Sequence, residues 1–453
     1  MRSARGRLQL ARAALLGAAG LAALAAGGCG SRDRSNPLDP LNPLTGGRLT
    51  GFTAVAGSAD VTLTWDALVY ATAPPVRLER ALASDSAFAL LADTPLALGQ
   101  YLDATAQPGQ DYVYRARVVT ASGLTAPVLA GAQPGPERPW VADAGLDRVV
   151  LLSPDGRAVR LDLEGFIFPA GIAWDPVLRR VWVANTFGGT VVELDSSGTV
   201  VGTHTPLDFP HAVAADPVSG GCWVADDHEG VVVRLGRDGA ELARATSFAG
   251  PVALAPTRDG GGGVWVAEAD AGRVTLLRGD GTRVVSRPGF SLPQGLAVDP
   301  GAAGRDPGVW VADYGADQVV KLSAEGLTVF RLVGIPGPTA VDVDPGDGSA
   351  WVATARGGTG AVTRLGADGH FVWRVDGLVD PVAVAAEADP DQDVWVADAA
   401  DNAVWKIGGA GTPARRLGGL GYPLGISVDR GAPAPGSPGR ARLGPRRGPG
   451  IRS

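Results

Sequence analysis

A unit of about 42 residues recurs seven times along this sequence and constrains its fold more than any other feature. Every unit carries the tripeptide Trp-Val-Ala, a Pro-x-(Gly/Ala)-(Ile/Val/Leu) segment and a short turn that ends in glycine, always in the same register. Repeats of this length are typical of solenoids, propellers and related arrays. The tripeptides begin at Trp140, Trp182, Trp223, Trp265, Trp310, Trp351 and Trp395. The leading prolines are Pro169, Pro210, Pro251, Pro293, Pro338, Pro381 and Pro423, and the turn glycines are Gly156, Gly198, Gly239, Gly281, Gly326, Gly369 and Gly411.

Each unit predicts four short β-strands. The segment after the leading proline starts the inner strand, Trp-Val-Ala lies in the second strand, and a third strand is joined to the outermost one by an Asp-Gly-type turn. A four-stranded unit cannot bury both of its faces alone, so the units must stack around an axis with the tryptophans between them. We therefore predict an all-β fold, with a seven-bladed β-propeller over residues 140–429.

The two ends of the repeat region predict how the ring closes. The first unit lacks an inner strand, and a spare one, Pro-Leu-Gly-Ile-Ser-Val-Asp at 423–429, follows the last unit. We expect this segment to pair with the first unit, which removes the open sheet edges that favour aggregation. Residues 430–453 are rich in proline, glycine and arginine and indicate a disordered tail. A frameshifted end is the alternative, and a full-length relative could then have six, seven or eight blades.

Residues 48–131 lack the repeat and form a separate β unit. The segments 60–66, 76–82 and 112–118 alternate apolar and polar residues, as half-buried strands do. An early strand with Trp65 and a late strand opened by Pro-Gly-Gln-Asp-Tyr112 resemble a fibronectin type III domain. The resemblance implies a β-sandwich that serves as a spacer or adhesive module, in which the Tyr112 hydroxyl hydrogen-bonds back to the chain.

The N-terminus resembles a bacterial export signal. Four arginines precede an apolar run that ends in Ala-Gly-Gly-Cys29, which predicts a signal peptide over 1–28, too short to span a bilayer. The cysteine resembles that of a lipobox, which implies acylation of Cys29 and a polar tether over 29–47. Gly30, in place of an aspartate, implies an outer-membrane lipoprotein, on the periplasmic side or at the cell surface. Secretion without a lipid is the alternative.

Charge and cysteine content exclude some functions. The net charge is −7 although the first 28 residues carry four arginines and no acid, so the rest of the chain is more acidic still. Such a chain repels phosphate backbones, and we expect no nucleic-acid partner. With Cys29 acylated, only Cys222 remains, so no intrachain disulfide can form and stability must come from hydrophobic cores.

The repeat itself resembles known propeller families. Pro-x-Gly-Ile-Ala-x-Asp followed by Trp-Val-Ala-Asp is similar to NHL repeats, and the segment 181–192 is similar to YVTN-type propellers. Enzymes of related architecture, the gluconolactonase-type hydrolases and streptogramin-lyase-like proteins, place metal ligands or a catalytic histidine around the axis, where the inner strands begin. The positions that this resemblance assigns to the rim are Ala170, His211, Val252, Gln294, Thr339, Val382 and Leu424. They hold one imidazole and no carboxylate, so we expect no metal, no cofactor and no catalysis, with a metal-dependent lactonase or lyase as the alternative.

Eight residues are candidates for contact with a ligand. Three of them, His211, Gln294 and Thr339, are the polar members of the rim; His211 could bind a ligand or relay a proton, or be a polar residue without a partner. The other five are the acids that close Trp-Val-Ala, which form either an anionic ring for a cationic partner or caps for the following turns. Their presence in most repeats favours the caps. These acids are Asp143, Asp226, Glu268, Asp313 and Asp398.

These patterns predict an exported lipoprotein whose propeller is a non-catalytic binding scaffold. The expected ligand is a protein or a polysaccharide, met on one face of the propeller, and the membrane is reached through the lipid alone. A structural envelope component whose repeats serve only for spacing is a further alternative. Nothing in the sequence predicts an oligomeric state.

Overall fold

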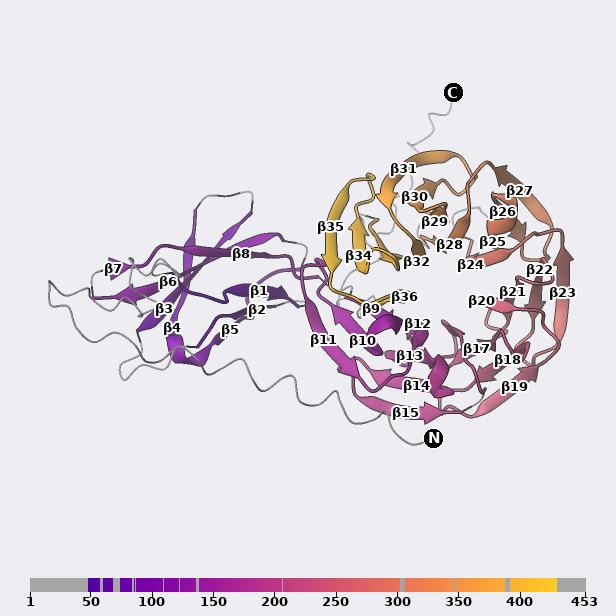
Figure 1. Cartoon of the computed structure of the whole chain (residues 1–453), viewed down its shortest axis with the longest axis horizontal. Coiled ribbons are helices and arrows are strands. Elements are labelled where there is room, and N and C mark those ends of the chain that lie inside the picture. The colour runs from indigo at the N-terminus through magenta and orange to yellow at the C-terminus, as the bar shows by residue number, and fades with distance from the viewer. Residues whose placement is uncertain are drawn as a thin grey trace, which may run out of the picture.

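The computed structural model describes residues 48–429, except for 58–59, 68–73, 84, 86, 109, 122, 136–137, 206, 302–305, 345–346 and 388–391. The predicted signal peptide (1–28), Cys29, the tether (29–47) and the tail (430–453) lie outside the described residues. The described chain forms a ring of sheets preceded by a smaller unit of two sheets (Figure 1). No helix among the described residues is long and apolar enough to cross a membrane.

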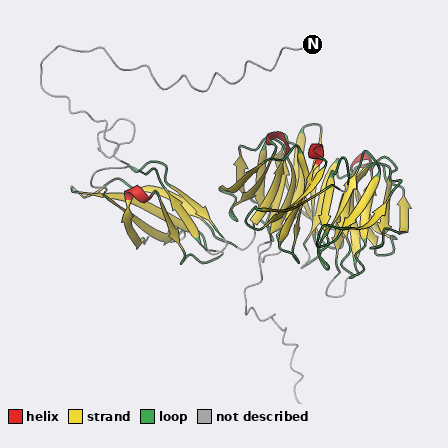
Figure 2. Ribbon diagram, turned by 90° about the horizontal axis from the view of Figure 1, so that it is seen from below, coloured by secondary structure: helices red, strands yellow, loops and turns green. Residues whose placement is uncertain are grey.

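The ring consists of seven antiparallel sheets of four strands each, which confirms the predicted seven-bladed propeller. Figure 1 looks down the ring, and Figure 2 shows the blades from the side. We number the blades 1 to 7 in the chain order of their second strands, which carry the tryptophans. The strand order from the axis outwards is β36-β9-β10-β11 in blade 1, and four consecutive strands in each later blade, from β12–β15 in blade 2 to β32–β35 in blade 7.

The strands at equivalent places in the seven blades have the following bounds. The inner strands are β12 (Pro169–Asp175), β16 (Ala212–Ala215), β20 (Pro251–Pro256), β24 (Pro293–Asp299), β28 (Pro338–Val343), β32 (Pro381–Ala386) and β36 (Pro423–Asp429). The second strands are β9 (Arg138–Asp143), β13 (Arg180–Asn185), β17 (Cys222–Asp226), β21 (Val264–Glu268), β25 (Gly308–Asp313), β29 (Ala350–Arg356) and β33 (Val394–Asp398). The third strands are β10 (Arg148–Leu152), β14 (Thr190–Asp195), β18 (Val231–Leu235), β22 (Arg273–Leu277), β26 (Gln318–Ser323), β30 (Thr359–Leu365) and β34 (Ala403–Ile407). The outer strands are β11 (Val159–Glu164), β15 (Val200–His204), β19 (Glu241–Ala245), β23 (Arg283–Pro288), β27 (Thr328–Val333), β31 (Phe371–Leu378) and β35 (Pro413–Gly418).

The turns between third and outer strands explain the glycine of each repeat. All seven turn glycines have φ between 67° and 87°, a region that a residue with a Cβ adopts only with strain. In blade 2, the Gly198 amide donates a hydrogen bond to the Asp195 carbonyl at 3.0 Å and closes the turn. Three further turns, which follow second strands, are short 3₁₀ helices: η2 (Ala144–Leu146), η3 (Thr186–Gly188) and η4 (Tyr314–Ala316).

The tryptophans of Trp-Val-Ala form the cores between blades, as predicted. All seven side chains are at most 2% exposed, and each belongs to a hydrophobic cluster that includes residues of the next blade. Trp310 of blade 5, for example, lies in one cluster with Val341 and Val352 of blade 6. The seventh cluster joins Trp395 of blade 7 to Ile426 of blade 1. The ring is therefore held by a core at every junction.

The C-terminal strand closes the ring, which confirms the prediction for 423–429. Strand β36 pairs antiparallel with β9, with Ile426 opposite Val141 and Asp429 opposite Arg138. The two residues of that last pair also form an ion pair in which the Asp429 side chain is fully buried. Blade 1 thus combines the first and the last strands of the described propeller.

The smaller unit is a β-sandwich of two sheets around one core. One sheet has β1 (Thr53–Ala56), β2 (Val61–Thr64) and β5 (Gln100–Asp103); the other has β3 (Pro75–Leu82), β4 (Ala89–Pro95), β6 (Tyr112–Thr120), β7 (Gly123–Leu124) and β8 (Val128–Ala132), and η1 spans Leu96–Leu98. Trp65 is buried in the shared core and its Nε1 donates to the Leu96 carbonyl at 2.9 Å. The Tyr112 hydroxyl accepts a hydrogen bond from the Gln107 amide at 3.2 Å, which is the contact back to the chain that the sequence predicts.

Asp103, at the end of β5, gives the sandwich a predictable dependence on pH. Its buried carboxylate accepts hydrogen bonds from Tyr114 Oη at 2.9 Å, from Thr105 and from Arg80. Burial alone would raise the pKa of Asp103, but these hydrogen bonds outweigh burial and hold the pKa below its ordinary value. A lowered folded-state pKa means that the stabilisation is present above the unfolded value of about 3.9 and is lost as the pH falls through the folded value.

We expect the Asp103→Asn variant to lose part of this acid-induced destabilisation. Hydrogen exchange of peptides from 48–132 in the full chain, in moderate denaturant over a pH series that extends below about 3.9, measures the effect. The wild-type sandwich should open at acid pH while the variant, already less stable at neutral pH, changes less. Equal pH dependence in the two proteins would show that Asp103 is not the responsible group.

Candidate functional site

The inner strands surround an axial channel that opens on both faces of the ring. We call the face on which the inner strands begin the front face, which is towards the viewer in Figure 1, and the opposite one the rear face. The front mouth is a cavity of about 410 Å³. All seven rim positions lie in its wall, namely Ala170, His211, Val252, Gln294, Thr339, Val382 and Leu424.

The polar side chains of the rim offer few groups with which a ligand could form hydrogen bonds. Thr339 Oγ1 donates to the Pro381 carbonyl at 2.6 Å, so this hydroxyl joins blade 6 to blade 7. The half-buried side chains of His211 and Gln294 make no hydrogen bond that the structure records with a described residue. The mouth therefore offers one imidazole and one amide to a ligand, without a carboxylate or a second base beside them.

Deeper in the channel, the wall becomes apolar. The third residue after each leading proline is a branched aliphatic one, and four of these seven side chains line both the front and the rear cavity. A small polar molecule that enters the front mouth thus meets an apolar ring. The ring consists of Ile172, Val213, Leu254, Leu296, Val341, Val384 and Ile426.

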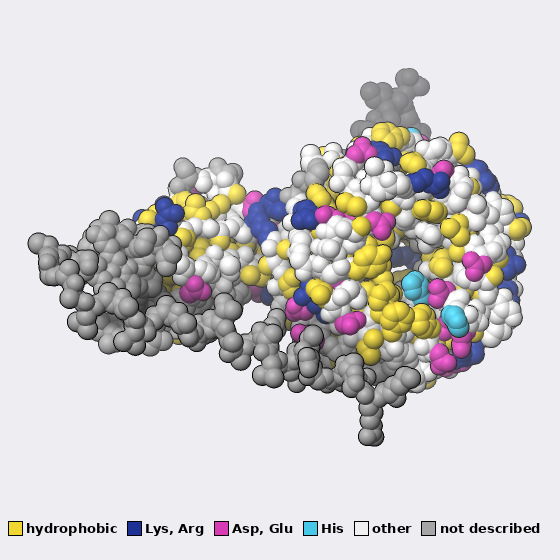
Figure 3. All heavy atoms as spheres, viewed as in Figure 1, with side chains coloured by type: hydrophobic (Ala, Val, Ile, Leu, Met, Phe, Trp, Pro, Cys, Tyr) yellow, Lys and Arg dark blue, Asp and Glu magenta, His cyan; other side chains and the backbone are white. Residues whose placement is uncertain are grey.

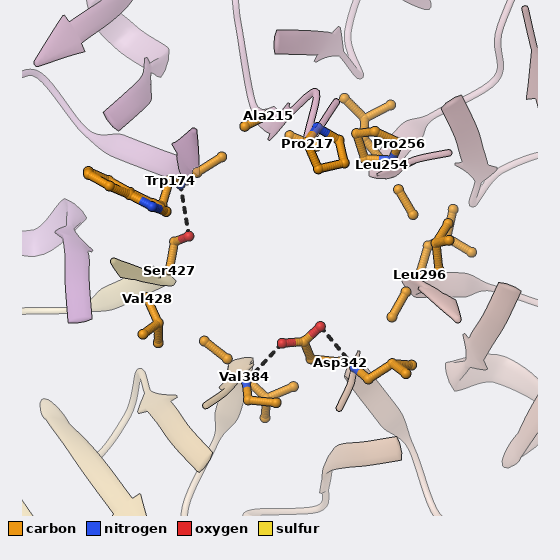
Figure 4. A pocket seen from close by; sticks show the side chains of 18 of the residues that line it. Trp174, Ala215, Pro217, Leu254, Pro256, Leu296, Asp342, Val384, Ser427 and Val428 are labelled. Carbon is orange, nitrogen blue, oxygen red and sulfur yellow. Dashed lines mark hydrogen bonds between the residues drawn. The ribbon is translucent and has the colours of Figure 1, made fainter. Parts of the chain in front are cut away.

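The rear mouth is a cavity of about 560 Å³ in which two polar side chains, Asp342 and Ser427, accept hydrogen bonds from backbone amides (Figure 4). Asp342 stands where most inner strands have alanine, and its two oxygens accept hydrogen bonds from the Val343 amide at 2.9 Å and the Ala386 amide at 2.8 Å. Ser427 Oγ accepts one from the Trp174 amide at 2.9 Å. Both side chains therefore join inner strands of neighbouring blades.

The acids that close Trp-Val-Ala are structural. The Asp226 carboxylate accepts hydrogen bonds from the Phe209 amide, in the loop that leads into the inner strand of the same blade, and from the Glu229 amide in the following turn. Asp398 binds the loop of its own blade in the same way, through the Val379 and Asp380 amides at 2.8 Å. This arrangement matches the capping alternative, extended to the preceding loop, and not an anionic ring open to a ligand. All five acids are 0% exposed: Asp143, Asp226, Glu268, Asp313 and Asp398.

The front face carries a feature that the sequence analysis missed, an arc of rings in blades 2 and 3. Centroids of Phe168 and Phe187 are 4.6 Å apart, those of Phe187 and Phe209 are 5.2 Å apart, and His228 lies 6.3 Å from Phe209. We call these four residues the aromatic arc. Phe187 is 56% exposed, and so is neighbouring Ile167 at 52%. Figure 3 shows hydrophobic side chains gathered on this side of the front face, beside histidine and acidic side chains.

Comparison of the repeats shows that the fold does not require these rings. Phe168 and Phe209 each precede a leading proline, and the equivalent residues are Gly250, Leu292, Gly337, Asp380 and Tyr422. Phe187 and His228 stand second after the residue that closes Trp-Val-Ala, and the equivalents are Gly145, Asp270, Gly315, Arg356 and Ala400. Since glycine or alanine stands at each of the two positions in some of the other blades, the fold does not need a ring at either position. Alignment of the seven units at these two positions is the signal that could have revealed them.

Phe168 even occupies a strained backbone position. Its φ is +53°, and the equivalent glycines of blades 4 and 6, Gly250 and Gly337, have φ of +62° and +52°. A bulky residue in this left-handed region is an outlier that costs about 1–2 kcal/mol per residue. The repeat offers glycine as the unstrained choice, so this ring is present at a cost to the fold.

The described residues contain no group of three or more histidine, cysteine, aspartate or glutamate side chains placed to hold a metal ion. We therefore expect the melting temperature of the full chain to be the same in Ca²⁺, Mg²⁺, Zn²⁺, Mn²⁺ or chelator. An ion that binds only the folded state would add about 2.7 kcal/mol at a concentration one hundred times its Kd. An upward shift that grows with ion concentration would contradict this account and favour the metal-dependent lyase or lactonase.

Comparisons with known proteins identify the fold. A functionally unknown protein from Desulfotomaculum acetoxidans shares 15% identity, over 64% of this chain and 98% of its own, with a TM-score of 0.57. A streptogramin B lyase shares 16% identity over 57% and 86%, with a TM-score of 0.47. Virginiamycin B lyase from Staphylococcus aureus shares 15% over 55% and 84%, with a TM-score of 0.45. No protein-family profile and no curated protein sequence matches this chain. The match to the first of these structures supports the β-propeller, and fold alone does not assign an activity.

Proposed function

We propose that this protein is an envelope lipoprotein, anchored through Cys29, whose propeller binds a macromolecular partner without catalysis. The observation that carries the proposal is the aromatic arc on the front face. Contiguous exposed apolar side chains on a soluble domain mark interaction sites, and aromatic residues supply a large share of binding energy at interfaces. Phe187 and His228 are exposed, Phe168 and Phe209 are half-buried, and Phe168 strains the backbone. These are properties of a binding surface.

The same proposal gives the sandwich the role of a spacer. Its two sheets, with Trp65 in the core and the Tyr112 hydroxyl bonded to the chain, support the resemblance to a fibronectin type III domain. Arg160 of β11 donates a hydrogen bond to the Ala56 carbonyl of β1, so the sandwich contacts the outer strand of blade 1. That contact is at the side of the ring and leaves the arc in blades 2 and 3 accessible. We also propose that the seven repeats are of the NHL type, which they resemble in sequence.

The test is capture of a partner by matched variants of the full chain. The wild type, the double variant Phe187→Ala/Phe209→Ala and the control Val333→Ala are incubated with an envelope fraction, and bound proteins and polysaccharides are quantified. Val333 is 75% exposed on the outer strand of blade 5 and serves as an apolar control. We expect a partner that the wild type and the control retain equally and that the double variant loses. Equal capture by all three would show that the arc is not the binding surface.

The anchor has a separate test. A Cys29→Ser variant cannot be acylated at that thiol, and we expect it to leave the membrane fraction while its propeller melts as before. Retention in the membrane fraction would contradict the lipoprotein part of the proposal and leave the scaffold part intact.

A further inference from the structure

We infer that the partner is a protein whose exposed segment combines basic and apolar side chains, the apolar ones packed on the aromatic arc and the basic ones above the acids of blades 3 and 4. This inference rests on the proposed binding role of the arc and adds the chemistry of the occupant.

Three aspartates in loops of blades 3 and 4 add negative charge to the front face beside the arc. Asp208 precedes Phe209, Asp227 precedes His228, and Asp270 occupies the equivalent turn of blade 4. Asp208 and Asp270 are exposed and Asp227 is half-buried, and the structure records no ion pair between any of them and a described residue. Exposed or half-buried carboxylates of this kind attract cations within roughly 10 Å, the screening length at 0.1 M salt.

Two arginines that begin third strands at the front face, Arg148 and Arg273, are paired with other acids. Arg148 of blade 1 binds Asp143 at 2.9 Å and Asp162 at 2.7 Å. Arg273 of blade 4 binds Glu268 at 2.7 Å. Their charges are already paired, so the negative field beside the arc is left for a partner. A segment with lysine or arginine complements it.

The rings of the arc differ from other aromatic rings of this protein in having no cation of a described residue recorded over them. Elsewhere this protein places its own cations over aromatic rings: Arg283 lies 4.2 Å from the centroid of buried Phe248, and Arg356 lies 5.1 Å from that of half-buried Tyr314. Within the described residues, no such cation is recorded over Phe187 or Phe209. A basic side chain of a partner could occupy these faces, since a cation over an aromatic ring is attracted by its quadrupole.

The arrangement favours a protein segment over a polysaccharide. Neighbouring rings of the arc are inclined by 30° between Phe168 and Phe187 and by 56° between Phe187 and Phe209. They form a stepped surface, suited to separate side chains, and not one flat platform for successive sugar rings. An anionic polysaccharide would be repelled by Asp208, Asp227 and Asp270, and a neutral one could donate hydroxyl hydrogen bonds to them but would lack the ionic attraction of a basic side chain.

Defined probes test this inference on the full chain. The probes are a fluorescent peptide in which arginine alternates with leucine, the same peptide with citrulline in place of arginine, and fluorescent dextran as a neutral polysaccharide. Binding is measured by anisotropy at several salt concentrations. We expect the arginine peptide to bind at least tenfold more tightly than the citrulline peptide or dextran, and added salt to weaken it.

Three variants assign the effect to the residues. Phe187→Ala/Phe209→Ala should weaken the arginine peptide by about tenfold or more, as loss of aromatic hot spots does. Asp208→Asn/Asp227→Asn/Asp270→Asn should weaken it and remove most of its salt dependence. Phe168→Gly should weaken binding without loss of melting temperature, because glycine relieves the positive φ. That combination separates a binding role from a structural one.

The outcomes are distinct from those of the capture experiment. Equal binding of the arginine and citrulline peptides, or binding of dextran alone, would overturn the inference while a partner captured through Phe187 and Phe209 would still support the proposed function. Binding of the arginine peptide that all three variants retain would overturn the assignment to this surface.

Discussion

A chain that stops at Tyr422 is expected to lose the cooperative unfolding of the whole propeller. Without β36, the second strand of blade 1 has a free edge, and the core between blades 7 and 1 loses Ile426 and Val428. Two buried aliphatic side chains and the hydrogen bonds of one strand pair together contribute roughly 5–10 kcal/mol. A domain has only about 5–15 kcal/mol of net stability, so the truncated ring should be open and prone to aggregation.

The matched control is a chain that stops at Asp429, which keeps β36 and removes only the residues beyond it. We expect the propeller of this control to melt like that of the full chain, in one cooperative transition. Calorimetry of the three proteins, with light scattering for aggregation, makes the comparison. Cooperative melting of the Tyr422 truncation at the wild-type temperature would show that the closing pair is not required.

Replacement of one inter-blade tryptophan should have the second largest effect. Trp310 is fully buried, its ring lies 5.1 Å from that of Phe330 in the same blade, and its cluster includes Val341 and Val352 of the next blade. Substitution of a buried tryptophan by alanine costs about 3–5 kcal/mol, since it removes transfer energy and leaves a cavity. We expect Trp310→Ala to lower the free energy of unfolding by this amount in a denaturant titration.

Val333→Ala is the control for this variant, because its side chain is 75% exposed and truncation there should change the free energy of unfolding by less than about 0.5 kcal/mol. A cost of under about 1 kcal/mol for Trp310→Ala, below the range for a buried tryptophan, would contradict the view that the tryptophans hold adjacent blades together.

The repeat made the fold predictable. Three markers in one register give the number of blades, the strand on which each tryptophan lies and the turns in which glycine takes a positive φ. Ring closure followed from a missing strand at one end and a spare one, 423–429, at the other. These predictions depend on backbone hydrogen bonds and on burial, which act alike in every unit. The periodicity of the sequence was therefore sufficient for these predictions.

The candidate site was less predictable because it consists of departures from the repeat. The acids that close Trp-Val-Ala became candidate ligand contacts because they recur, but they recur because each blade needs the same local contacts. Asp226, for example, binds backbone amides and is fully buried. The arc was not predicted, since Phe168, Phe187 and Phe209 lie between the three recurring segments by which the repeat is recognised. Their proximity depends on how consecutive blades place these loops on the front face, and the strain at Phe168 depends on a backbone angle. The spacing of residues in the sequence reveals neither the proximity of the rings nor the strain at Phe168.

A photo-crosslinking scan around the front face tests the central claim most directly. A photoreactive residue is placed in the full chain, one position at a time, at four equivalent positions: Phe187 and His228 in blades 2 and 3, and Arg356 and Ala400 in blades 6 and 7. All four side chains are exposed, and each stands second after the residue that follows Trp-Val-Ala, Arg356 as the last residue of β29. We expect adducts with a partner from Phe187 and His228 and none from Arg356 and Ala400. Adducts of equal yield from all four positions, or only from Arg356 and Ala400, would contradict a binding surface on blades 2 and 3.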